Sequence, residues 1–312
     1  MGSVTHAETK TEERLDPIAV MPPEGKVPDS LVMWADGPNH SRFAIIADKG
    51  QRTLSVWGKK EGLPYLVEAH PMDMGKKEGD KKYRGDHKTP EGIYFPLSIN
   101  EGPTLNFDEY GVRAFVLDYP NFFDKRARKT GDGIWLHAIP DTKSLMRGSR
   151  GCVVVRNEII EKITPMIDLN KTPVIILDEA KYITKNELKK RNNNLKTWLE
   201  NWRAAWASKD LDRYMEFYGD DFRALKMNKK VWRRYKQGLN EKYQSISVKT
   251  INPVGFSNGE EAVVTFLQEY ESETMKDFGV KTLYLRQNGD SFTISGEQWK
   301  AASPELLAQV PQ

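Results

Sequence analysis

Two short apolar runs, each beside a reactive side chain, constrain the fold of this chain most. Ile134–Leu136 leads directly into His137, and Cys152 directly precedes Val153–Val155. Short apolar or β-branched runs bounded by glycine are typical of buried strands. Fifteen residues separate His137 from Cys152, which is enough for a loop and a return to a neighbouring strand. The pattern therefore predicts a strand that ends at His137 and places Cys152 at a loop-to-strand junction.

The pairing of Cys152 with His137 suits nucleophilic catalysis. An imidazole can take the proton of a thiol and later return it to a leaving amine. The backbone N–H of Cys152 could stabilise a developing oxyanion, because Gly151 leaves room for close approach. The plainer alternative is a small buried cysteine and an unrelated histidine. Since Cys152 is the single cysteine of the chain, no internal disulfide can form.

The length and composition predict a globular protein of two domains. The chain has 312 residues, of which 38% are hydrophobic and 29% charged, with a net charge of +3. No apolar run is long enough to cross a membrane. We expect Met1-Gly2-Ser3 to be a cloning remnant that replaced a signal peptide. The histidine spacing and the single cysteine predict no metal site, and no nucleic-acid motif is visible.

Two motifs resemble the YkuD family of L,D-transpeptidases and L,D-carboxypeptidases. His137 followed by Ser149-Arg-Gly-Cys152 matches the histidine and the Ser-x-Gly-Cys element of that family. Thr89-Pro-Glu-Gly-Ile-Tyr94 matches its Thr-Pro-x-Gly-x-Tyr segment. The resemblance covers roughly residues 40–178. It departs at Ala138, where the family often has glycine, and at Val154, where it often has arginine; both bear on substrate specificity.

Many short strands separated by glycine turns predict a β-rich first domain at residues 30–180, and the resemblance implies a mixed sheet sandwich. Residues 1–29 are polar and proline-bearing, which predicts an extended arm that wraps the body or is partly disordered. Families with similar architecture can use such an arm for dimer contacts, so a homodimer through the arm stays open. The expected elements are strands at 31–34, 43–46, 53–57, 65–69 and 173–177, and a helix at 158–167. The connection at 101–132 could form a lid beside the active site; we favour core filler for its aromatic residues.

A second, α+β domain is predicted at residues 185–305. Helices are expected at 186–209, 211–217 and 227–243, and strands at 245–251, 262–270, 280–287 and 291–295. Helices followed by an antiparallel meander predict an α+β cone. The stretch Trp202-Arg-Ala-Ala-Trp206, followed by Tyr214, Phe217-Tyr218 and Asp221-Phe222, resembles the opening helices of NTF2-like domains. We interpret Trp198, Trp202 and Trp206 as core and the basic helix as a solvated face, and we identify no catalytic set here.

The resemblance also implies roles around the nucleophile. The carbonyl of Ala138 would orient the His137 imidazole, and Ser149 would shape the loop before Gly151 and Cys152. We expect Trp135 and Arg150 to line the cleft. Lys82 and Arg84 lie in a basic loop and could meet a substrate carboxylate. The alternative for each of these two is a solvated turn residue.

The pairing of a YkuD-like domain with an NTF2-like domain resembles the cell-shape L,D-carboxypeptidases of curved and helical Gram-negative bacteria. This resemblance implies a peptidoglycan-editing L,D-carboxypeptidase. Such an enzyme would remove the terminal D-alanine from stem tetrapeptides through a Cys152 acyl-enzyme, without a cofactor, and would influence cell shape from the periplasm. An L,D-transpeptidase, which makes crosslinks or exchanges D-amino acids, shares the acylation step and stays open. A cell-wall-binding module with an idle thiol is the alternative from another class.

Overall fold

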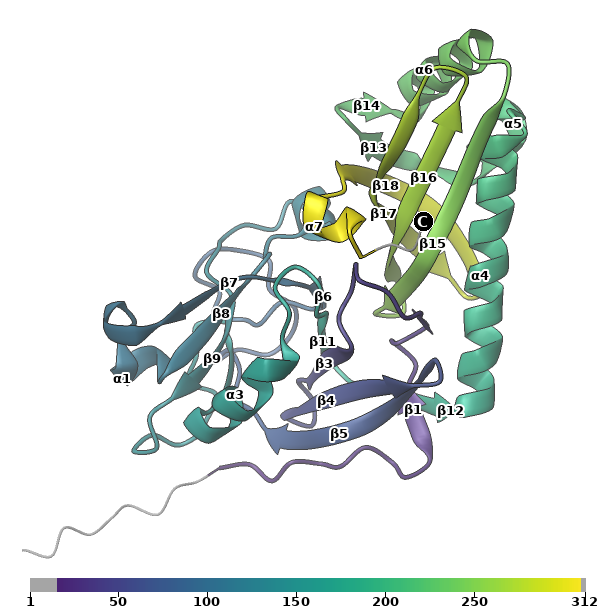
Figure 1. The fold of residues 1–312 in the computed structure, drawn as a ribbon. Helices are drawn as coiled ribbons and strands as arrows, with labels where there is room; N and C mark the ends of the chain where they lie inside the picture. The colour runs from purple at the N-terminus through teal and green to yellow at the C-terminus, as the bar shows by residue number, and fades with distance from the viewer. Residues whose placement is uncertain (1–15, 310–312) are drawn as a thin grey trace, which may run out of the picture.

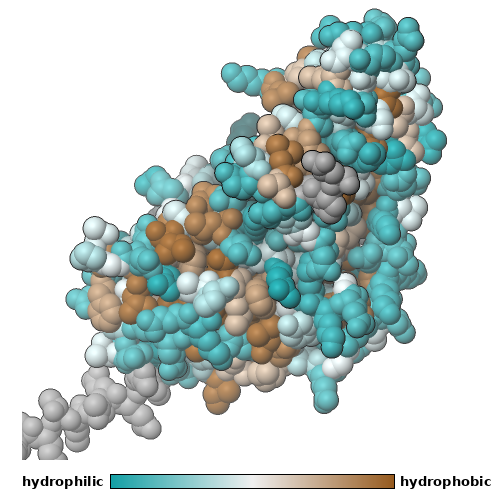
Figure 2. Space-filling view, in the orientation of Figure 1, coloured by the Kyte–Doolittle hydropathy of each residue, from teal (hydrophilic) through white to brown (hydrophobic). Residues whose placement is uncertain are grey.

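The structure, a computed structural model, describes residues 16–309. They form two lobes joined along one side (Figure 1). The N-terminal lobe holds β3 to β12, and the C-terminal lobe holds β13 to β18. Within residues 16–309 no helix is long and apolar enough to span a membrane. On the face shown in Figure 2, hydrophilic side chains predominate and the apolar ones form small separate patches.

Nine strands build the two main sheets of the N-terminal lobe. They are β3 (Phe43–Asp48), β4 (Thr53–Lys60), β5 (Leu63–Pro71), β6 (Gly92–Tyr94), β7 (Pro96–Glu101), β8 (Arg113–Leu117), β9 (Trp135–Ile139), β10 (Val153–Arg156) and β11 (Val174–Leu177). One sheet has the order β5-β4-β3-β11-β6, and the other has the order β10-β9-β8-β7. Both are mixed, because β11 is parallel to β3 and β10 is parallel to β9. The β-rich fold with mixed sheets is thus confirmed.

Short helices join these strands. They are η1 (Gly102–Thr104), α1 (Phe107–Tyr110), α2 (Phe122–Arg126), α3 (Asn157–Ile163) and η2 (Thr164–Met166). The central strands β3 and β11 are buried on both faces. Ile45 and Val174 point into the core between the two sheets, whereas Ile46 and Ile175 point towards the C-terminal lobe. Burial on both faces explains why both strands read as continuous apolar runs rather than as alternating ones.

The C-terminal lobe is a seven-stranded sheet with helices beside it. Its elements are β2 (Met33–Trp34), α4 (Lys185–Ala207), α5 (Leu211–Glu216), β13 (Tyr218–Ala224), β14 (Met227–Asn228), α6 (Lys229–Lys242), β15 (Ile246–Ser257), β16 (Glu261–Ser272), β17 (Lys276–Asn288), β18 (Ser291–Ala301) and α7 (Pro304–Leu307). The sheet order is β14-β13-β18-β17-β16-β15-β2. The predicted antiparallel meander after the helices is confirmed as β15 to β18, whereas β13 and β14, between α5 and α6, were not predicted.

Helix α4 runs along the C-terminal lobe and supplies much of its core (Figure 1). It begins with a capping box, in which Thr184 and Glu187 satisfy each other's backbone N–H groups. Trp202 and Trp206 are buried against the sheet, and Trp198 packs at the edge of the same core. The interpretation of these tryptophans as core residues is therefore confirmed.

The N-terminal segment joins both lobes. Strand β1 (Lys26–Pro28) pairs with β12 (Tyr182–Thr184), just before α4. Strand β2 pairs with β15 at Val254 and Gly255, so it belongs to the C-terminal sheet. The prediction that residues 31–34 form a strand of the first domain is wrong on this point. Packing decides the outcome, because the Trp34 ring meets the Phe256 ring edge-on at 6.2 Å. Residues 1–15 of the predicted arm lie outside the described residues.

Helix α2 connects the two lobes from the other side. The Phe122 ring stacks on the Tyr284 ring of β17, with centroids 4.2 Å apart and planes 13° apart. Gly296 of β18 leaves the space that the Phe122 ring occupies. The Arg126 guanidinium lies 3.6 Å from the Asp221 carboxylate. These contacts fix the chain segment that leads from α2 into β9.

Candidate active site

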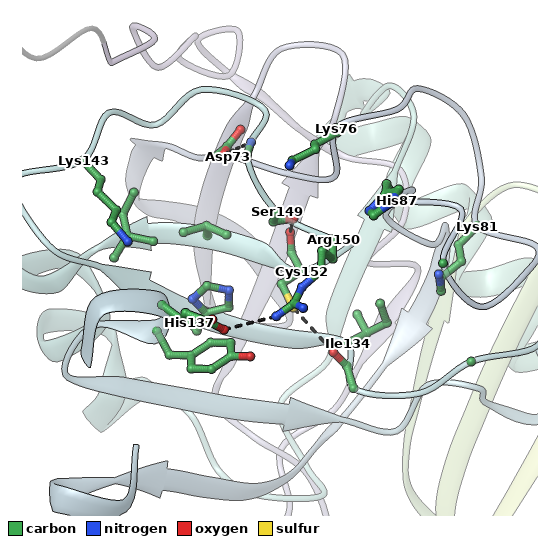
Figure 3. A pocket seen from close by; sticks show the side chains of 18 of the residues that line it. Asp73, Lys76, Lys81, His87, Ile134, His137, Lys143, Ser149, Arg150 and Cys152 are labelled. Carbon is green, nitrogen blue, oxygen red and sulfur yellow. Dashed lines mark hydrogen bonds and ion pairs between the residues drawn. The ribbon is translucent and has the colours of Figure 1, made fainter. Parts of the chain in front are cut away.

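The parallel pair β9 and β10 positions the two residues that the sequence singled out. His137 lies in the middle of β9, directly opposite Val154 of β10. The expectation that His137 ends its strand is therefore wrong, because Ala138 and Ile139 continue the pairing. Cys152 immediately precedes β10, at the predicted loop-to-strand junction. Both side chains line one cleft, in which Figure 3 shows them facing the same space.

The turn before Cys152 depends on Gly151. Its φ of +135° is one that residues with a side chain rarely adopt. A Cβ built there would lie 2.6 Å from the backbone oxygen of Lys88. Ser149 closes the turn, since its hydroxyl donates to the Cys152 carbonyl (2.8 Å) and accepts from the Gly151 N–H (3.1 Å). The loop thus presents Cys152 on a fixed backbone.

The tautomer of His137 is set by its own strand. Nδ1 lies 2.6 Å from the Ala138 carbonyl oxygen, which can only accept a hydrogen bond. The proton therefore sits on Nδ1, and Nε2 is left as the nitrogen that can take a proton. The Tyr110 ring stands edge-on to the imidazole, 5.1 Å between centroids, and limits its rotation.

Burial keeps both groups uncharged. It raises the pKa of the Cys152 thiol to about 11, against the attraction of Arg150. It lowers the pKa of His137 to about 4, although the hydrogen bond to Ala138 favours the protonated ring. Between these two pKa values the pair is a thiol beside a neutral imidazole. A nucleophilic role for Cys152 would therefore require the thiolate to form together with attack on a bound substrate.

The cleft around the pair has a volume of about 640 Å³ and carries charges of both signs. Arg150 pairs with Glu109 (3.1 Å), and Arg84 pairs with Asp132. Arg84 and Arg150 thus line the cleft, and each brings an acidic partner. In Figure 3, Arg150 lies beside Cys152, whereas Lys81 lies on the far side of the cleft.

Two predicted substrate-binding residues lie elsewhere. Lys82 is not part of the cleft wall; its neighbour Lys81 is, with its ammonium 2.7 Å from the Asp86 carboxylate. Trp135 is also absent from the wall. Its ring packs 4.7 Å from that of Tyr110, which does line the cleft.

Sequence reasoning missed several wall residues. Tyr110 had been interpreted as core filler, and no local signal marked it, because its place depends on the packing of α1 against β9. Asp73 and His87 also line the cleft without having been singled out. Asp73 and His87 face the site because distant strands pair and bring their loops to it. A local sequence pattern does not reveal such long-range pairing.

The Thr89–Tyr94 segment supports the site without touching the reacting atoms. The buried Thr89 hydroxyl accepts from the Gly75 N–H at 2.9 Å. The Tyr94 hydroxyl lies 3.1 Å from the Asp124 carboxylate. Lys88, just before this segment, supplies the backbone oxygen that faces Gly151. The backbone just before the motif thus lies directly against the turn that precedes Cys152.

The C-terminal lobe contains a second cavity, of about 630 Å³. Lys236 of α6 is buried in its wall, with its ammonium 4.0 Å from the centroid of the Trp206 ring. Lys281 and Glu297 form a buried ion pair beside it, at 2.8 Å. The interpretation of the basic helix as a solvated face is therefore wrong for Lys236. Within residues 16–309 no group of acidic, histidine or cysteine side chains is arranged to hold a metal ion.

Comparisons with known proteins agree with this two-lobed design. The L,D-transpeptidase catalytic domain model, YkuD, matches residues 42–176. The Cds6 C-terminal NTF2-like domain model matches residues 194–298. The domain limits predicted at 30–180 and 185–305 stay predictions. A comparison with curated proteins gives no match.

Two solved structures resemble the whole chain. Bd1075 from Bdellovibrio bacteriovorus is 42% identical, with a TM-score of 0.83, and the alignment covers 89% of this chain and 99% of that one. The helical cell shape determining protein Pgp2 from Campylobacter jejuni is 24% identical, with a TM-score of 0.69 over 86% of this chain and 96% of that one. The chain belongs to the family of proteins that join a YkuD L,D-transpeptidase catalytic domain to a Cds6 C-terminal NTF2-like domain.

Proposed function

We propose that this protein is a cysteine L,D-carboxypeptidase that trims peptidoglycan stem peptides. The observation that carries the proposal is the arrangement of Cys152 and His137, which share one cleft while Ala138 fixes the imidazole tautomer. Cys152 attacks the carbonyl that joins an L-centre to the terminal D-alanine. The C–N bond breaks, D-alanine leaves, and a thioester remains on Cys152 until water hydrolyses it.

His137 moves the proton in both half-reactions. Its Nε2 takes the thiol proton during attack and gives it to the leaving amine. It then activates the water that cleaves the thioester. The Ala138 carbonyl stabilises the imidazolium that forms in between, because it accepts from Nδ1. The backbone N–H groups around Gly151 and Cys152 are the candidates for binding the oxyanion.

An L,D-transpeptidase uses the same acyl-enzyme and passes it to an amine instead of to water. We favour hydrolysis because the pairing of a YkuD domain with an NTF2-like domain resembles the cell-shape L,D-carboxypeptidases. The proposal extends to an influence on cell shape and to a periplasmic location, where stem peptides are found. A homodimer formed through the N-terminal arm belongs to the same set of proposals.

A wall-binding module with an idle thiol predicts a different outcome. Slow labelling of the thiol does not separate it from an enzyme, because burial already raises the pKa of Cys152 to about 11 in the free protein. Only turnover distinguishes the two. An enzyme should lose all turnover when Cys152 is replaced. A binding module should show no turnover with or without Cys152, and its binding to the wall should not change.

The test is incubation of the protein with a muropeptide digest, followed by mass analysis. We expect tetrapeptides to lose one D-alanine with the wild type and to stay intact with Cys152→Ala, whose thermal stability should be close to wild type. Crosslinked dimers or exchanged D-amino acids would identify a transpeptidase. Full turnover by Cys152→Ala would refute the mechanism, and an unchanged digest would favour the binding module.

A further inference from the structure

The segment between the two catalytic strands forms much of the cleft wall. This catalytic loop, residues 140–151, follows β9 and precedes Cys152. Its wall residues are Lys143, Ser144, Gly148, Ser149 and Arg150. Leu145 points inward instead, is fully buried, and packs in an apolar cluster with Cys152 and Val154. The position of Leu145 therefore determines how closely Cys152 is covered.

Arg156 binds the backbone of the first half of this loop. It is the last residue of β10 and is only 4% exposed. Its Nη1 donates to the Pro140 carbonyl at 3.2 Å and to the Lys143 carbonyl. Carbonyl oxygens satisfy hydrogen bonds of the guanidinium but do not neutralise its charge. A buried guanidinium needs a carboxylate to offset its desolvation.

That carboxylate comes from the N-terminal segment. The Arg156 Nε lies 2.8 Å from Oδ2 of Asp16, and Nη2 donates to Oδ1 of the same side chain. Such a two-point pair fixes orientation as well as charge. Asp16 Oδ1 also accepts from the backbone N–H of Leu145 at 3.0 Å. The Asp16 carboxylate thus binds both the Arg156 guanidinium and the backbone of Leu145, which packs over Cys152.

The other anchors of the loop come from the N-terminal lobe itself. Arg52 donates to the Leu145 carbonyl and to Asp73, the latter at 3.2 Å. Asp73 in turn accepts from the Gly148 N–H at 2.8 Å. These contacts hold the carbonyl side of Leu145 and the second half of the loop. The Leu145 N–H and the Arg156 guanidinium are instead bound by the Asp16 carboxylate.

We propose that Asp16 is a positioning residue of the active site, which holds the catalytic loop over Cys152 through Arg156 and the Leu145 backbone. The effect on catalysis rests on the proposed function; the effect on Cys152 exposure does not. The N-terminal segment accordingly contributes to the geometry of the active site, in addition to joining the two lobes.

The test compares Asp16→Asn with the wild type by two readouts. The first is the rate at which iodoacetamide alkylates the protein, which reports on Cys152 alone because the chain has one cysteine. We expect about a fivefold faster rate, since a loosened Leu145 exposes the thiol. The second is turnover of a tetrapeptide. We expect kcat/KM to fall about tenfold with a higher KM, because the loop forms the cleft wall.

Three further variants serve as controls. Asp29→Asn breaks another carboxylate–arginine pair of the same segment, 3.1 Å from Arg191, and should change neither readout. Asp16→Glu keeps the charge and should restore part of both. Leu145→Ala keeps Asp16 but removes the cover, so it should also accelerate alkylation. This last variant keeps the inference testable if Asp16→Asn does not fold.

Alkylation of folded Asp16→Asn at the wild-type rate would overturn the inference, whatever its turnover. Equal acceleration by Asp29→Asn would overturn it as well, because a general loosening of the segment would then suffice. A wild type that is inactive on tetrapeptides would refute the proposed function, while the alkylation result would still decide the role of Asp16.

Discussion

In the proposed mechanism, Cys152 and His137 divide the work of catalysis between two uncharged groups. Many thiol nucleophiles are kept as thiolates by a nearby positive charge. Here burial works against both charged forms, and the Ala138 carbonyl is the one direct partner of the imidazole among the described hydrogen bonds. The proposed mechanism therefore requires the proton to move from sulfur to nitrogen while the substrate carbonyl is attacked.

This neutral pair predicts the pH dependence of kcat/KM for tetrapeptide hydrolysis. As the pH falls through about 4, His137 takes up a proton and can no longer accept one from Cys152, so kcat/KM should fall. Above this limb we expect a plateau up to about pH 10, because the thiol keeps its proton. A loss of activity centred near pH 6.5, the ordinary pKa of histidine, would contradict the neutral pair.

At the residue scale the sequence identifies chemistry better than orientation. Cys152 and His137 stand out because few side chains can act as nucleophile and base. Lys82 and Trp135 were expected in the cleft, yet their neighbours in sequence or space, Lys81 and Tyr110, line it. The direction of a side chain on a loop depends on pairings with distant strands, which adjacent residues do not encode.

Among the secondary-structure elements, α6 departs most from its sequence pattern. Its basic residues suggested a solvated helix, but Lys236 is buried against aromatic rings. Burial lowers the pKa of Lys236 to about 7. Burial also opposes the charge of Glu297, but Lys281 and Lys236 together hold the pKa of Glu297 below its usual range.

Replacing Lys236 by methionine should stabilise the protein. The change removes a poorly solvated amine and keeps the Lys281–Glu297 pair, so we expect a gain of about 1–2 kcal/mol at neutral pH. The unfolded amine stays protonated up to about pH 10. Wild-type stability should therefore rise as the pH increases from about 7 to about 10, and the advantage of Lys236→Met should shrink.

Urea unfolding of the wild type and Lys236→Met, at about pH 7 and about pH 10, measures this difference in the free energy of unfolding. The matched variant Glu297→Gln should lose about 3 kcal/mol, because it leaves two buried lysines without a carboxylate. An advantage of Lys236→Met that grows with pH would contradict the explanation.

The helices α3 to α6 were predictable because their apolar spacing is local, and α4 to α6 also begin at local capping side chains. The strand at residues 31–34 shows the opposite case. Its composition indicates a strand, but its partner, Val254–Gly255, lies far along the chain in the other lobe. No property of the short segment itself selects between the two sheets.

At the scale of the whole molecule, the lobe contact and the active site are joined by one stretch of chain. Helix α2 is held by Tyr284 and Asp221 of the C-terminal lobe. The residues that follow it, Gly131 to Ile134, line the cleft. The Cys152 Sγ lies 3.5 Å from the Gly133 carbonyl. The order of the two domains could be read from sequence motifs, whereas this contact could not.

Phe122→Ala should weaken the contact between the lobes. Loss of the stacked ring removes apolar packing and leaves an empty space beside Gly296, so we expect a destabilisation of about 3 kcal/mol. Calorimetry should then resolve two unfolding transitions, whereas we expect a single one for the wild type. Phe107→Ala, at a ring that is 50% exposed, should leave a single transition. One transition for Phe122→Ala would show that other contacts suffice.

The burial of Cys152 also bears on how long the protein survives chemically. Peroxides and disulfides react with a thiolate rather than with a protonated thiol. A sulfenic acid on Cys152 would find no second cysteine in the chain with which to condense. A resting thiol that keeps its proton is thus the chain's own protection against oxidation. In the proposed mechanism the reactive thiolate arises only while a peptide occupies the cleft, so the exposure of Cys152 to oxidants is limited to turnover.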